Sequence, residues 1–180
     1  VAVGGRIDMG TDVDPIPAGV KATLILAQGN GSIRFGLTVP AGASFSARGA
    51  EKSPCALSLT DISNPVGVTS LQVSSAAAQG WGIGDTIVLG QTEIPAPWAN
   101  QTEEKVVTNI TGTDPKTISW TGDPAYAHRT TNGSFYVLNL TRNVLIRSSG
   151  TFTSLNTAYI SDQVQTLADF RLVQAEVAYI

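Results

Sequence analysis

Short apolar runs separated by polar corners constrain the fold of this 180-residue chain more than any other feature. In LNLTRNVLIRSSG, residues 138–150, the strand formers Leu140, Val144 and Ile146 are interrupted by Asn, Thr and Arg residues. This stretch has neither the tight glycine turn of a hairpin nor the continuous apolar face of a helix. It is typical of a parallel β-helix, in which short strands form the faces of each coil and polar residues form the corners.

The ending Ala-Tyr-Ile supports the same interpretation, because it occurs at 158–160 and again at 178–180. In a β-helix each strand pairs with the strand on the same face of the next coil, so similar residues stack. A helix within the tail 162–180 is the alternative, since Val164, Leu167 and Leu172 roughly fit helical spacing. The β-branched and aromatic residues of the tail favour strands.

The chain changes in character twice, which predicts an insertion. Residues 1–54 and 139–180 consist of short strands that end at turn formers, and we expect β-helix coils in both segments. Residues 55–138 contain a hairpin, with strands at 105–110 and 117–120 joined by the turn sequence TGTDPK. We therefore expect an all-β protein in which a small antiparallel barrel or curled sheet is inserted between β-helix coils.

Composition narrows the classes of function. Charged residues make up 14% of the chain and the net charge is −3, with no basic run, so nucleic acid is not an expected partner. No run approaches about 18 apolar residues, so no membrane-spanning helix is predicted. Few charges with abundant Thr, Ser, Gly and Val are typical of extracellular all-β proteins, and we expect an extracellular or cell-surface location. The first residues lack a signal-peptide pattern, so if the protein is secreted we expect this chain to be the processed or excised part.

Four short motifs occur in a recognisable order: GWGIGD at 80–85, TEEKVV at 102–107, AYAH at 125–128 and LTRNV at 140–144. With their spacing, the sequence from about residue 5 to 150 resembles the eight-glycine (G-eight) domain. That domain occurs in fibrocystin-type proteins, in relatives of cell-surface hyaluronidase and in bacterial or algal surface proteins. The resemblance implies a right-handed parallel β-helix with pectate-lyase-like coils and a surface location. It carries no catalytic residue over to this chain.

The residues themselves offer no evident catalytic group. His128 is the only histidine. A Ser-His-Asp triad could use no other histidine, and a metal site with two histidine ligands is excluded. Glu103 and Glu104 are neighbours in a predicted strand, so their side chains point to opposite faces and cannot form an acid–base pair. The single cysteine, Cys55, is expected to be a small buried side chain at the start of a strand. We predict no catalytic residues and lean against an enzyme.

The sequence contains two candidate binding sites. Asp12 and Asp14, with Asp8 nearby, are a candidate calcium site, although the pattern of an EF-hand is missing and a turn is the simpler interpretation. No other cofactor is expected. Trp98 lies in the proline-rich segment IPAPWANQ and is the candidate for stacking on a sugar ring, whereas Trp81 in the glycine-rich corner is expected in the core.

Asn-x-Ser/Thr tripeptides are more frequent than the composition predicts, which makes glycosylation in a secretory pathway a hypothesis. The three loop positions are the more plausible acceptors, and the two positions within or beside strands rank lower. The five candidates, loops first, are Asn30, Asn100, Asn132, Asn109 and Asn139.

These features predict a noncatalytic structural or adhesive module of an extracellular surface protein. Because neither end of the sequence carries a polar capping segment, we expect the open β-helix ends to meet the remainder of a longer chain or copies of the same chain, as in a filament or sheath. The alternative is a polysaccharide-binding or hyaluronidase-like polysaccharide-degrading fragment of a larger secreted enzyme. A viral tail-fibre segment would share the fold.

Overall fold

The computed structural model describes residues 4–29, 33–93, 100–150, 157–163, 169–178 and 180, and over these residues the protein is built from β-strands with one short 3₁₀ turn. The chain divides into two compact units, which are described separately. The first unit comprises residues 1–51 and 142–180, and the second comprises residues 52–141. The predicted insertion, 55–138, falls within the second unit.

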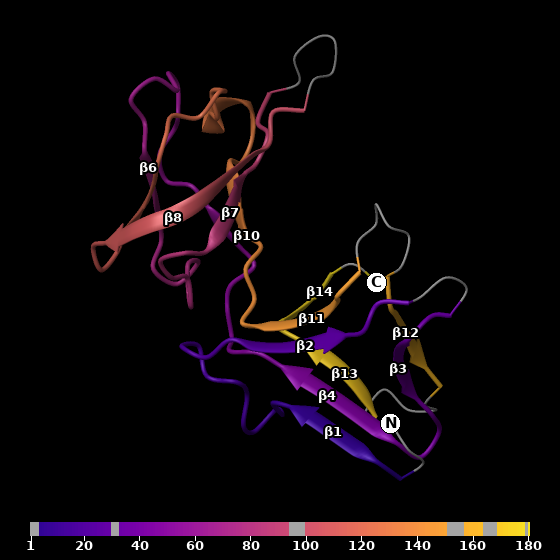
Figure 1. Ribbon diagram of the computed structural model, residues 1–180. Helices are drawn as coiled ribbons and strands as arrows, with labels where there is room; N and C mark the ends of the chain where they lie inside the picture. The colour runs from indigo at the N-terminus through magenta and orange to yellow at the C-terminus, as the bar shows by residue number, and fades with distance from the viewer. Residues whose placement is uncertain (1–3, 30–32, 94–99, 151–156, 164–168, 179) are drawn as a thin grey trace. The chain divides into compact units, whose positions relative to one another are not determined.

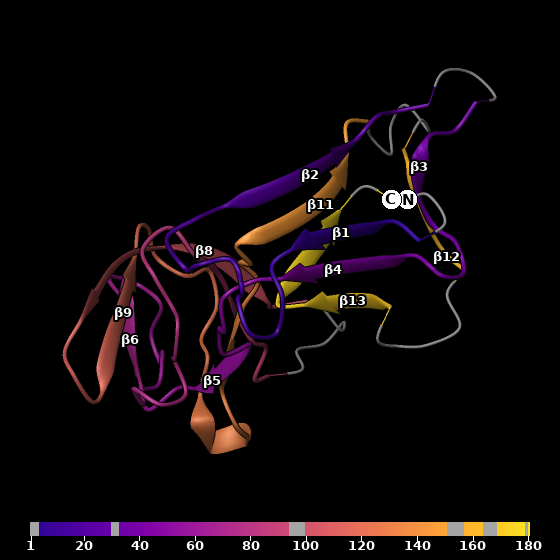
Figure 2. The same ribbon diagram turned by 90° about the horizontal axis from the view of Figure 1, so that it is seen from below.

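Parallel pairing defines the first unit (Figures 1 and 2). Its strands form three small sheets with the orders β1-β4-β13, β14-β11-β2 and β12-β3. The strands are β1 (Arg6–Met9), β2 (Ala22–Leu26), β3 (Gly36–Val39), β4 (Ser44–Arg48), β11 (Val144–Ser148), β12 (Tyr159–Asp162), β13 (Phe170–Val173) and β14 (Ala175–Ala178).

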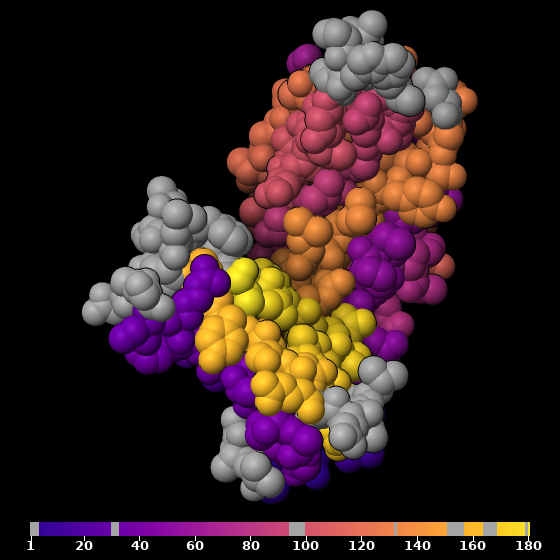
Figure 3. Space-filling model, turned by 90° about the vertical axis from the view of Figure 1, so that its right-hand side faces the viewer, coloured from indigo at the N-terminus to yellow at the C-terminus, as the bar shows by residue number. Residues whose placement is uncertain are grey.

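The first unit winds through its three sheets in a fixed order. The chain passes through β2, β3 and β4, and after the second unit it passes through β11, β12 and β13, which pair in parallel with β2, β3 and β4 respectively. It then returns with β14 to the sheet of β11. On the face shown in Figure 3 the late strands, in yellow and orange, lie beside the purple segment of β3 and β4. Each of the three sheets therefore contains one strand from the β2-β3-β4 turn and one from the β11-β12-β13 turn.

The core of the first unit comes from the inward positions of these strands. In β11 the burial pattern alternates strictly, with Val144 and Ile146 inside. Ile146 pairs with Leu24 on one side and Val177 on the other, so apolar residues stack from turn to turn. Phe45 is 1% exposed and its ring lies 5.8 Å from the ring of Phe170. Burying such side chains stabilises the folded state by about 1.5–3 kcal/mol each.

Antiparallel pairing defines the second unit, in which six strands follow the order β5-β10-β7-β8-β9-β6. The sheet curls, because an isolated bridge between Ser58 and Val73 joins its two outer edges. A register shift between Val107 and Asn109 in β8 adds to the bend. The strands are β5 (Cys55–Leu57), β6 (Ser70–Val73), β7 (Thr86–Leu89), β8 (Glu103–Thr111), β9 (Lys116–Trp120) and β10 (Tyr136–Asn139), and the 3₁₀ turn η1 is Thr130–Asn132.

Several local predictions are confirmed by these elements. The predicted hairpin is β8 and β9, which pair in antiparallel register. Trp81 is 7% exposed and its Nε1 donates to the carbonyl of Ser53 at 2.8 Å, so it belongs to the core as expected. The described part of the tail forms β13 and β14 rather than a helix.

The predicted orientation of Cys55 is wrong, and strand parity explains why. Cys55 is exposed, because Ala56 is the residue of β5 that faces the core. Leu57 points outward with Cys55, since alternate residues share a face. Near β3, Phe35 is 48% exposed while Leu37 and Val39 in the strand are buried. The regular strand starts only at Gly36, so the alternation does not extend back to Phe35.

Candidate functional site

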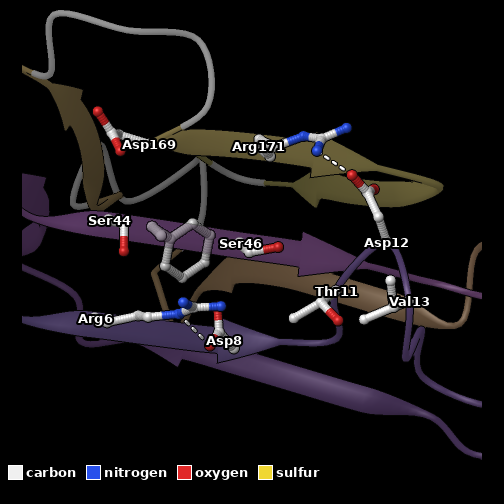
Figure 4. A pocket seen from close by; sticks show the side chains of 10 residues that line it. Arg6, Asp8, Thr11, Asp12, Val13, Ser44, Ser46, Asp169 and Arg171 are labelled. Carbon is white, nitrogen blue, oxygen red and sulfur yellow. Dashed lines mark hydrogen bonds and ion pairs between the residues drawn. The ribbon is translucent and has the colours of Figure 1, made fainter.

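A polar groove of about 300 Å³ lies on the outer face of the β1-β4-β13 sheet (Figure 4). Ser44 and Ser46 on the central strand β4 form its floor. Longer charged side chains form its two walls, one from β1 and the other from β13 and Asp169, the residue before β13. The segment 11–13 lines one end. The wall residues are Arg6, Asp8, Asp169 and Arg171. Small side chains between two rows of large ones create the hollow.

The parallel register places these residues together. Asp8 pairs with Ser46, and Ser46 pairs with Arg171, so the three side chains form one row across the sheet. Arg6 pairs with Ser44 in the next outward row. Phe45 lies between the two rows in sequence and points inward, because successive residues of a strand face opposite sides. Strand alternation therefore separates the polar groove from the apolar core beneath it.

Ion pairs fix the charged groups around the groove. Arg6 Nε donates to Asp8 Oδ2 at 2.6 Å. The carboxylate of Asp12 accepts from Arg48 at 2.7 Å and, through its other oxygen, from Arg171. The side chains of Arg6 and Arg171 are 66% and 42% exposed, so each pair contributes at most about 1 kcal/mol to stability. Their effect is to orient donors and acceptors at the groove surface.

The floor of the groove offers no open backbone edge. β4 pairs with β1 on one side and with β13 on the other, so its N–H and C=O groups are used within the sheet. A ligand in this groove would contact hydroxyl, guanidinium and carboxylate groups rather than main chain. Among the described lining residues there is no histidine or cysteine to act as a base or nucleophile. This arrangement suits binding through hydrogen bonds.

The second unit contains the histidine and the glutamate considered from the sequence. The His128 ring is fully buried and stacks on Phe135 with 5.1 Å between centroids. Its Nδ1 lies 2.8 Å from the carbonyl oxygen of Gly90, and its Nε2 lies 3.2 Å from Glu103 Oε1. Glu104, the next residue, is exposed. Both ring nitrogens thus face acceptors inside the fold. His128 therefore links the segments that contain Gly90 and Glu103, and it is not accessible as a base.

Glu103 anchors the loop that precedes His128. Its two carboxylate oxygens accept the backbone N–H groups of Ala125 and Tyr126 at 2.8 and 2.9 Å. Burial by itself raises the pKa of Glu103, but these two hydrogen bonds lower it. The bond with His128 and the charge of Lys105 lower it further, so the pKa lies below its ordinary value of 4.5. Glu103 is therefore an ionised structural anchor.

Asp85, the last residue of the GWGIGD motif, is a second structural anchor. The motif did not indicate this role. Asp85 is 5% exposed and forms an ion pair with Lys52 at 2.6 Å. Its other oxygen accepts the N–H of Gly82 at 2.9 Å and the side-chain amide of Asn139 at 2.7 Å. The motif residues thus join a turn, a strand end and β10 through one buried carboxylate.

The glycosylation candidates differ in accessibility. Asn100 and Asn109 are exposed, and the backbone of Asn132 lies in the turn η1. Asn30 lies outside the described residues, as does the sugar-stacking candidate Trp98. Asn139 is incompatible with an acceptor role in this fold, because it is 2% exposed and its amide bonds to Asp85.

The calcium candidates Asp12 and Asp14 are used otherwise. Asp12 binds two arginines, and both of its carboxylate oxygens are engaged. Asp14 belongs to a turn in which its N–H donates to Thr11 Oγ1 at 3.1 Å. Within the described parts of the chain, no group of three or more His, Cys, Asp or Glu residues is placed to hold a metal ion.

Sequence reasoning missed the groove residues, apart from Asp8 and Asp12. Ser46 and Arg171 lie on opposite sides of the second unit in the sequence, and no local pattern connects them. A usable signal would have been the alternation of β4, in which Ser44 and Ser46 alternate with Phe45 and Ala47. That pattern predicts a polar outer face but does not show which strands flank it.

Comparisons with known proteins are sparse. No family model matches the sequence, and no curated protein matches it. Among solved structures, the chain is similar to the Gp54 tailspike of Acinetobacter baumannii bacteriophage AP22, solved in complex with A. baumannii capsular saccharide. The identity is 14% and the TM-score is 0.41, and the alignment covers 97% of this chain and 30% of the tailspike. The chain thus spans less than a third of that protein, and the likeness carries no argument about function.

In the parts of the chain that the structure describes, no helix is long and apolar enough to cross a bilayer.

Proposed function

We propose that this chain is a noncatalytic adhesive module of an extracellular surface protein, and that the polar groove of its first unit binds a glycan. The groove is the observation that carries the proposal. It combines paired guanidinium and carboxylate groups with two hydroxyls on a floor without free backbone groups. A guanidinium that donates and a carboxylate that accepts, held side by side, match the vicinal hydroxyls of a sugar. An extended peptide would instead need an open strand edge.

The scaffold part of the proposal is a right-handed parallel β-helix of the kind implied by the resemblance to the eight-glycine domain. The ordered return to three parallel sheets supports it. β1, β2 and β3 lie at the outer edges of their sheets, and such edges accept further strands. We propose that these edges meet further coils, from a longer chain or from another copy. Light scattering of the protein across a range of concentrations tests for association between copies.

A glycan-binding experiment tests the groove directly. Wild-type protein is applied to a panel of immobilised polysaccharides, and Ser44→Tyr is compared with it. Ser44 has intermediate exposure on the floor, so a tyrosine there fills the groove and should abolish binding. Ser161→Tyr, at a half-buried position in the middle of β12 on another sheet, is the matched control and should bind normally.

Two further measurements separate this proposal from its alternatives. Trp98→Ala removes the sugar-stacking candidate. If this variant binds the polysaccharides as wild type does, Trp98 is not needed for recognition, and the groove remains the binding site. Release of reducing ends from hyaluronan and related polymers tests the degrading alternative, and we expect none. Loss of binding in Trp98→Ala with full binding in Ser44→Tyr would overturn the assignment to the groove.

A further inference from the structure

Charges of opposite sign face one another across the groove. On one wall Arg6 precedes Asp8, and on the other Asp169 precedes Arg171. The row across Ser46 therefore has a carboxylate at one end and a guanidinium at the other. The positive and negative groups alternate both along the groove and across it (Figure 4). We propose that this arrangement makes the groove selective for neutral polyhydroxylated chains over polyanionic ones, an inference that rests on the proposed glycan-binding function.

Both arginines of the groove, Arg6 and Arg171, are already paired with neighbouring carboxylates. Asp8 lies 2.6 Å from Arg6, and Asp12 binds both Arg171 and Arg48. An acidic sugar that bound these guanidinium groups would bring its own negative charge close to the carboxylates already paired with them, and the like charges would repel. The net charge of −3 adds a weak long-range repulsion of polyanions. Repulsion of the wrong ligand is an ordinary source of specificity.

A neutral hydroxyl group meets no such obstacle. It donates to a carboxylate and accepts from the paired guanidinium at the same time, so the ion pair stays in place. These ion pairs lie at the surface, with Asp8 and Asp12 side chains 33% and 44% exposed, and their outward lone pairs and N–H groups remain available to a ligand. Neutral sugars thus gain charge-assisted hydrogen bonds without separating any charges.

The experiment compares matched neutral and charged forms of the same polymers. The probes are dextran against dextran sulfate, and methyl-esterified against de-esterified polygalacturonate. We expect the wild-type protein to bind the neutral member at least about tenfold more tightly than the anionic member. Equal or tighter binding of the anionic members would overturn the selectivity. No binding of either member, in both pairs, would contradict the glycan-binding function itself.

Near-isosteric charge variants provide the second arm. Asp8→Asn and Asp12→Asn, made singly and together, remove the carboxylates that pair with Arg6 and Arg171. We expect the double variant to lose the preference for neutral polymers and to bind the anionic members in a salt-sensitive manner. Glu176→Gln, which removes one exposed charge from β14 on another sheet, should keep the wild-type preference. An unchanged preference in the double variant, with wild-type circular dichroism, would overturn the inference.

Discussion

Two carboxylates, the buried Asp85 and the half-buried Glu103, organise the second unit at the scale of single residues. Both lie in two of the four short motifs named from the sequence, GWGIGD and TEEKVV, and neither lines the groove. Asp85 accepts one backbone N–H group and pairs with Lys52, and Glu103 accepts two backbone N–H groups and contacts His128. Strong motifs in this chain therefore report structural anchors, and removing one carboxylate should affect stability rather than ligand binding.

Asp85→Asn should lower the free energy of unfolding of the second unit by about 3 kcal/mol, because it leaves the ammonium group of Lys52 without its partner. The side chains of Lys52 and Asp85 are 14% and 6% exposed, so solvent replaces little of the lost interaction. Urea titration followed by tryptophan fluorescence measures the change. Asp123→Asn, at an exposed aspartate that accepts one backbone N–H, is the control and should change stability much less. Equal effects would contradict the role given to Asp85.

The lowered pKa of Glu103 predicts how stability depends on pH. A carboxyl group with a lower pKa in the folded state stabilises the fold fully above its unfolded pKa and loses this effect as the pH falls through the folded pKa. The contribution of Glu103 should therefore decline below about pH 4.5. Glu103→Gln should be less stable than wild type at neutral pH, and the difference should shrink in acid.

Glu104→Gln is the control for this titration, because Glu104 is adjacent and exposed. Its free energy of unfolding should follow the wild-type curve over the whole pH range. If the Glu103→Gln curve also ran parallel to wild type, the carboxylate would not be the anchor that its hydrogen bonds indicate.

At the scale of elements, close packing fixes the spacing of the parallel strands in the first unit. Gly36 in β3 pairs with Tyr159 in β12, and a Cβ atom at this glycine would lie 2.2 Å from the carbonyl oxygen of Tyr159. Gly36→Ala should therefore force the two strands apart and cost about 1–3 kcal/mol. Thermal unfolding measured by circular dichroism checks this. Gly19→Ala is the matched control, since a Cβ atom at Gly19 would have no neighbour within 4 Å, and a large loss there would contradict the packing argument.

How far the sequence predicts the structure depends on how local each feature is. The hairpin of β8 and β9 was predictable because its turn residues lie between its strands. The burial of Trp81 followed from its place in a glycine-rich corner. Cys55 was placed on the wrong face because a strand as short as Cys55–Leu57 does not show its parity. The groove needed the pairing of β4 with β13, which the second unit separates in sequence, so local patterns could not assemble it.

At the scale of the whole molecule, the two units have separate hydrophobic cores. Ile146 belongs to the core of the first unit and Ile118 to that of the second, and both are fully buried. The three tryptophans, at 81, 98 and 120, all fall within the second unit, so tryptophan emission reports on that unit alone. This distribution gives a way to follow each core.

Ile118→Ala should shift the unfolding transition seen by tryptophan emission, with a cost of about 2–5 kcal/mol. Ile146→Ala should leave that transition in place and shift a separate transition seen by far-ultraviolet circular dichroism, because each core is expected to unfold with its own unit. Identical shifts of one common transition in both variants would show that the two cores unfold together, against this expectation.

The central claim concerns the groove, and chemical-shift mapping by NMR tests it most directly. The protein is titrated with the neutral polysaccharide fragment that binds best on the panel, and backbone amide shifts are followed. We predict that the changes concentrate at the groove on β1, β4 and β13, around Asp8, Ser46 and Arg171. Changes centred on Trp98 or on the second unit, or no changes at all, would contradict the account.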